Sequence, residues 1–128
     1  MSVQIEKVRN YVTGEVVEQV YAGTDTITSG TTTAEEVVAR TVPKGYEGVI
    51  VSMAVTRNTS INVYIFINGK VPPDYADGWN AGGLAGLDYE TPLLIPLEEG
   101  DKWSLKFTNP GASDVDVSWR IRIRLFKK

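Results

Sequence analysis

Polar and apolar side chains alternate without a break over residues 114–125, near the end of the chain. A period of two is typical of a β-strand with one buried and one solvated face. At about 3.3 Å per residue this strand would extend roughly 40 Å, which is long for a strand. The apolar positions are Val115, Val117, Trp119, Ile121, Ile123 and Leu125, and the polar ones are Asp114, Asp116, Ser118, Arg120, Arg122 and Arg124.

Shorter segments with the same alternation precede this strand, and turn residues separate them. They span residues 37–42, 48–57, 61–67, 93–97 and 103–107, and their apolar faces place Met53, Trp103 and Phe107 in the core together with Trp119. Asn68-Gly69 is the strongest hairpin signal, because both positions of a type I′ turn need positive φ. The pattern predicts an all-β, single-domain antiparallel β-sandwich. A jelly roll is the expected topology, and an immunoglobulin-like sandwich is the alternative.

The first 35 residues differ from the rest. Segments 3–12 and 15–21 favour strands around a turn at Thr13-Gly14, and residues 22–36 are rich in Thr, Ser and Gly. Such a composition is typical of a connector or of an edge strand with two polar faces. We therefore divide the chain into an N-terminal β arm or connector, residues 1–35, and a β-sandwich domain, residues 36–128. The arm is expected to dock on its own sandwich or on a neighbour.

The composition excludes several classes of function. The 128 residues contain no histidine and no cysteine, so Ser-His-Asp and Cys-His catalysis and zinc–thiolate sites are excluded. Acidic pairs such as Glu98 and Glu99 fall in predicted turns, where carboxylates are solvated, so we expect no catalytic residues and no enzyme activity. The net charge of −3 argues against nucleic acid as a partner. We expect no cofactor.

The same sequence gives no sign of a membrane segment. No stretch approaches about 18 consecutive apolar residues, which a transmembrane helix needs. Residues 1–7 lack the apolar region of a signal peptide. We therefore expect a protein made in the cytoplasm, with no membrane as partner.

One long loop, residues 74–91, combines glycines with aromatic and acidic side chains. Loops of more than about 12–15 residues without regular structure are often functional. Aromatic rings near carboxylates can bind a sugar or a protein partner, or the rings can simply fix the loop on the sandwich. The aspartates lack EF-hand spacing, so no metal site is expected. The candidate contact residues are Asp74, Tyr75, Asp77, Trp79, Asp88 and Tyr89.

A second candidate surface is the outer face of the final strand. Arg120, Arg122 and Arg124 are expected there at about 6.8 Å spacing. They could contact an acidic surface of a neighbouring subunit. Alternatively, they form a solvated face whose charges pair across strands with acids such as those near Glu36.

Four turn motifs give the predicted sandwich a recognisable layout. They are Val42-Pro43-Lys44-Gly45, Ile67-Asn68-Gly69, Pro96-Leu97-Glu98-Glu99-Gly100-Asp101 and Thr108-Asn109-Pro110-Gly111. Over residues 37–125 this layout resembles small single-jelly-roll proteins of phage and archaeal virions, which serve as minor capsid, decoration, spike or tail components. No residue role transfers with this resemblance, because such proteins share a scaffold rather than a site.

The resemblance implies a non-enzymatic structural protein of the virion, on the capsid surface or in a spike. It further implies a homo-oligomer, with a trimer favoured, that docks on other virion proteins. The alternative function is a carbohydrate-binding module or lectin that uses the 74–91 loop.

Overall fold

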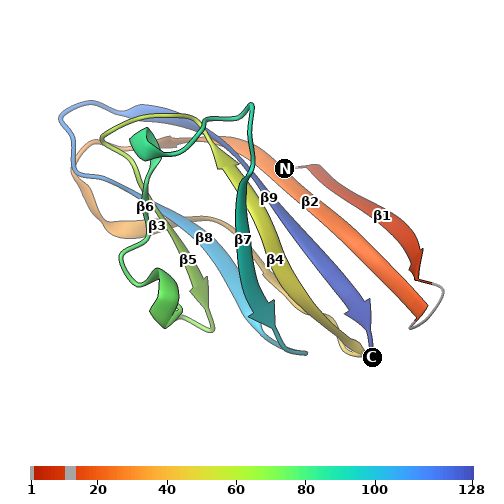
Figure 1. Cartoon of the computed structure of the whole chain (residues 1–128). Helices are drawn as coiled ribbons and strands as arrows, with labels where there is room; N and C mark the ends of the chain where they lie inside the picture. Colours follow the sequence, from red (N-terminus) through yellow and green to blue (C-terminus); the bar gives the residue numbers. More distant parts are fainter. Residues whose placement is uncertain (1, 11–13) are drawn as a thin grey trace.

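A computed structural model describes residues 2–10 and 14–128 as two antiparallel sheets that share one apolar core (Figure 1). The predicted all-β sandwich is confirmed. One sheet has the strand order β1-β2-β9-β4-β7, and the other has the order β3-β8-β5-β6. The strands are β1 (Ser2–Asn10), β2 (Gly14–Ile27), β3 (Thr31–Thr41), β4 (Tyr46–Val55), β5 (Asn62–Ile67), β6 (Trp79–Asn80), β7 (Thr91–Leu97), β8 (Lys102–Asn109) and β9 (Val115–Lys127).

The strand pairing is nested. β2 pairs with β9, β3 with β8, β4 with β7 and β5 with β6, and every pair is antiparallel. The further pairs β4–β9 and β5–β8 join these strands into their sheets. This pattern is what one long antiparallel hairpin gives when it folds over on itself and divides its strands between two layers.

The final strand β9 lies between β2 and β4 and forms the centre of the larger sheet. Its predicted inner row is buried from Val117 to Leu125, with Ile121 and Ile123 fully inaccessible to solvent, and Val115 at the start of the strand is half-buried. Trp119 is buried as well, and its indole nitrogen donates a hydrogen bond of 2.8 Å to Asp25 on β2. This hydrogen bond satisfies the one polar atom of the buried ring.

Residues 14–35 contribute strands to both sheets. The boundary expected between residues 35 and 36 falls inside β3. β2 is in register with β9 from Val16↔Phe126 to Ile27↔Val115, so this part of the N-terminal segment belongs to the sandwich. The predicted turn residue Thr13 lies outside the described residues.

The turn after β5 forms as the sequence predicts. Asn68 and Gly69 both have positive φ, 52° and 81°, and Lys70 makes one bridge back to Ile67 before Pro72 ends the pairing. The short helical turns η1 (Pro73–Tyr75) and η2 (Ala81–Gly83) follow in the long loop. In the described part of the chain no helix has the length and apolar character to cross a bilayer.

Candidate functional site

The long loop divides into two halves with different surroundings. In the first half, the rings of Tyr75 and Trp79 stack with centroids 5.1 Å apart and planes inclined by 30°. Both rings pack against the core, and Trp79 begins β6, which pairs with β5. Gly78 permits this approach, because a Cβ there would lie 2.3 Å from the carbonyl oxygen of Val63. These two aromatics thus fix the loop on the smaller sheet.

The second half of the loop lies against the outer face of the larger sheet. Arg120 on β9 donates one hydrogen bond of 2.9 Å to the carbonyl oxygen of Leu87 and another of 3.0 Å to the carboxylate of Glu90. Ser52 on β4 donates from its hydroxyl to the same carboxylate. Charged and polar groups therefore hold the end of the loop over the arginine row.

Arg122 is the centre of an ionic network that crosses three strands. Its guanidinium donates to Glu90 on one side, at 2.9 Å from both carboxylate oxygens, and to Glu18 of β2 on the other side. Arg124 makes a longer contact of 3.4 Å with Glu18. We call Glu18, Ser52, Glu90, Arg120, Arg122 and Arg124 the arginine network.

The arginine network shifts the protonation equilibria of its members. The hydrogen bond from Arg122 lowers the pKa of Glu90 from 4.5 to about 2, and Ser52 and Arg120 act in the same direction against the cost of partial burial. The hydrogen bond from Arg122 also lowers the pKa of Glu18, and the two carboxylates raise the pKa of Arg122. Both carboxylates are therefore ionised at neutral pH, which suits an ion pair and opposes a role as general acid.

Three large apolar side chains are exposed in the part of the chain with described side chains, and all three lie near β7. They are Leu87 at 38% exposure, Tyr89 at 73% and Leu94 at 75%. Tyr89 is in the loop end that Arg120 and Glu90 fix, and Leu94 is the middle residue of β7. We call Leu87, Asp88 and Tyr89 the loop tip.

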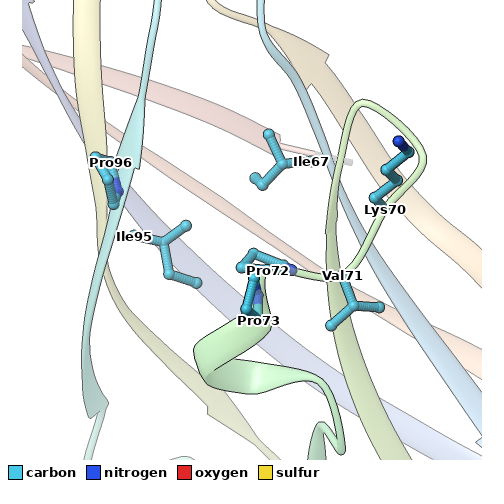
Figure 2. A pocket seen from close by; sticks show the side chains of 7 residues that line it. All are labelled: Ile67, Lys70, Val71, Pro72, Pro73, Ile95 and Pro96. Atoms are coloured by element: carbon cyan, nitrogen blue, oxygen red, sulfur yellow. The ribbon is translucent and has the colours of Figure 1, made fainter.

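An apolar pocket of about 360 Å³ lies beside Ile95 and Pro96, in the second half of β7. Figure 2 shows the side chains of β7 on one side and those of the turn after β5 on the other. Its lining residues are Ile67, Lys70, Val71, Pro72, Pro73, Ile95 and Pro96. Lys70 is the one charged group in this lining, and it is exposed. We call this feature the β7 pocket.

The structure brings some predicted site residues together and separates others. The loop tip shares a surface with the arginine row through Arg120, whereas Tyr75 and Trp79 belong to the packed half of the loop. The acids that face the arginines are Glu18 and Glu90, and the expected pairing with the Glu36 segment is wrong because Glu36 lies on β3 in the other sheet.

The loop aspartates do not gather at one point. Asp74, within η1, and Asp77, just after it, are both exposed, and Asp88 lies in the loop tip. Among residues with described positions, no three acidic side chains are placed to hold a metal ion.

Sequence reasoning missed Glu18, Ser52, Glu90 and the whole β7 pocket. The sequence marks Glu18 only weakly, as a polar position in a segment that favours a strand; the structure places that strand beside the arginines. The pocket gave none, because its walls come from segments about 25 residues apart in the chain, a separation that only the folded topology closes. No protein-family model and no curated protein sequence matches this chain.

Proposed function

We propose that the protein is a non-enzymatic jelly-roll component of a virion, located on the capsid surface or in a spike, that acts by self-association and by docking on other virion proteins. The nested strand pairing carries this proposal. Among strands β2 to β9, the first pairs with the last, the second with the second to last, and so on to the central pair β5 and β6. This order supports a jelly roll over the immunoglobulin-like alternative. Jelly rolls are the sandwich of many viral capsid proteins.

The chemistry of the surface agrees with a binding role. Tyrosine and arginine are enriched at protein interfaces, and here an exposed tyrosine stands beside an arginine row. The absence of histidine and cysteine from the sequence removes the commonest nucleophile and base pairs. The two carboxylates with lowered pKa values are held as ion-pair partners.

Two measurements test this function. Size-exclusion chromatography with light scattering, over a range of concentrations, should give an oligomer, for which the resemblance implies a trimer. Antibodies against the recombinant protein should label particles purified on a density gradient from cells that carry the gene. A strict monomer at high concentration together with unlabelled particles would refute the proposal.

A carbohydrate-binding module is the second candidate. The exposed ring of Tyr89 next to Asp88 favours it, because a sugar stacks on an open aromatic face and donates hydroxyl protons to a carboxylate. A glycan array with Tyr89→Ala and Trp79→Ala separates the two halves of the loop. Specific binding that Tyr89→Ala abolishes would support a lectin, and an array without signal would exclude it for the glycans tested.

A further inference from the structure

A polar pocket lies at the end of the sandwich where the turn between β4 and β5 meets η2. Its volume is about 350 Å³, and it is lined by Arg57, Asn58, Thr59 and Gly82. Two hydrogen bonds join its walls. Arg57 donates to the carbonyl oxygen of Gly82 at 3.3 Å, and the amide of Asn80 donates to the carbonyl oxygen of Thr59 at 3.0 Å. This lining holds one positive charge and no carboxylate, and we call the feature the Arg57 pocket.

Arg57 is the one arginine within residues 16–128 that has neither a carboxylate nor an aromatic ring as a partner. The three arginines of β9 pair with carboxylates, and Arg40 lies over the ring of Tyr21. The hydrogen bond to Gly82 uses one of the five N–H groups of the Arg57 guanidinium, and no other bond of this side chain forms within those residues. Its aliphatic stem lies against Gly86, where a Cβ would be 3.4 Å from Cγ of the arginine. The guanidinium is therefore held in place with most of its donors unused.

The two polar side chains beside Arg57 also offer unused hydrogen-bonding groups. The Oδ1 atom of Asn58 accepts bonds of 2.9 Å from the backbone nitrogen and 2.7 Å from the hydroxyl of Ser60, so the amide nitrogen remains as a donor. Thr59 is exposed, and its hydroxyl forms no hydrogen bond within residues 16–128. The pocket thus combines one cation with a neutral amide and a neutral hydroxyl, which matches a ligand rich in acceptors.

We propose that the Arg57 pocket binds an acidic sugar, such as a hexuronic acid, through its carboxylate. A guanidinium binds a carboxylate through two parallel N–H bonds, and the groups of Asn58 and Thr59 can bind sugar hydroxyls. Ligand pockets measure about 300–1,000 Å³, so the volume here suits one sugar ring and exceeds what a carboxylate alone would fill. Phosphate fits less well, because a phosphate group carries roughly −1.5 to −2 charges and this pocket, on a chain of net charge −3, has one cation.

Amide NMR of the full chain, titrated with D-glucuronate, tests this site. Glucuronate should shift the amide signals of residues 57–60 and 82 to saturation, and D-glucose should bind at least tenfold more weakly. Arg57→Ala should raise the dissociation constant for glucuronate at least tenfold. Asn58→Asp keeps the acceptor that orders the turn but replaces the donor by a negative charge, so it should abolish binding. The matched control is Arg124→Ala, which removes the same charge from an exposed position of β9 and should leave the constant unchanged.

The altered side chains are exposed or half-buried, so circular dichroism should show folded variants. Glucose, acetate or inorganic phosphate that binds as tightly as glucuronate would overturn the proposal, because the site would then recognise only a sugar ring or only an anion. Binding that Tyr89→Ala abolishes and Arg57→Ala leaves intact would place the sugar at the loop tip and overturn it too, as would the absence of any shift. This inference does not depend on the virion role, which the oligomeric state and the labelling of particles test separately.

Discussion

The two faces of β9 are built from the same strand, yet different interactions hold them. On the inner row, Trp119, Ile121 and Ile123 are each at most 3% exposed and pack in the core between the two sheets. On the outer row, the Arg122 side chain is 29% exposed and is held by carboxylates from β2 and from the long loop. Packing is non-directional and needs only apolar neighbours, whereas the outer row needs particular partners at particular angles.

Truncation on the inner face should give the largest effect. Ile121→Ala removes a fully buried side chain and leaves a cavity that the surrounding core cannot close, so we expect a loss of about 2–5 kcal/mol in the free energy of unfolding. Urea denaturation measures this loss. The control Leu94→Ala deletes a side chain that is 75% exposed, and its effect should stay within about 0.5 kcal/mol. Similar losses for both variants would contradict the burial assigned to β9.

Removal of the central arginine should give the next largest effect. Arg122→Ala leaves Glu18 and Glu90 partly buried without their main partner, and hydrogen bonds to charged groups are worth about 1.5–3 kcal/mol. We expect a loss of about 2 kcal/mol in urea denaturation. Arg122→Lys should recover only part of it, because an ammonium cannot reproduce the guanidinium fork that contacts two carboxylates. Full recovery by lysine would show that charge alone holds the outer face.

The pH dependence of the free energy of unfolding tests the same network without removing a side chain from any strand. The pKa of Glu90 falls from 4.5 to about 2 on folding, so its ionised form is stabilised in the folded state. That stabilisation is complete above pH 4.5 and is lost as the pH falls through about 2. The difference in unfolding free energy between wild type and Glu90→Gln, about 1.5 kcal/mol at pH 7, should therefore shrink between these two values. A difference that persists at pH 2 would exclude the ion pair as its source.

The strand pattern could be predicted from sequence where one face is apolar and the signal is local. β9, β7 and the Asn68-Gly69 turn follow this rule. The part of β2 after Tyr21 is harder to predict as a strand, because its outward residues are polar and its inward residues include Gly23. The structure explains that glycine, since a Cβ there would lie 2.8 Å from Cζ2 of Trp119. In the sequence alone, a glycine that makes room for a ring 96 residues away cannot be told from a glycine in a connector.

The candidate site could be predicted only in part, for a similar reason. The aromatic residues of the long loop marked it as unusual, but Tyr75 and Trp79 turned out to be packed, and the exposed surface came from the loop tip. Glu90 positions that tip, and its partners are on β4 and β9. Pairings of this kind depend on strand order, which no local pattern encodes.

Within the outer face, Arg124 should contribute least to stability. Its side chain is 45% exposed, and its contact with Glu18 is 3.4 Å long, whereas Arg122 lies closer to the same carboxylate. An exposed pair in water gains little, because solvent screens it and two long side chains lose freedom. Arg124→Ala should therefore change the free energy of unfolding by about 0.5 kcal/mol or less, measured in urea beside Arg122→Ala. A loss equal to that of Arg122→Ala would mean that the arginine row acts as one cooperative unit rather than as a gradient centred on Arg122.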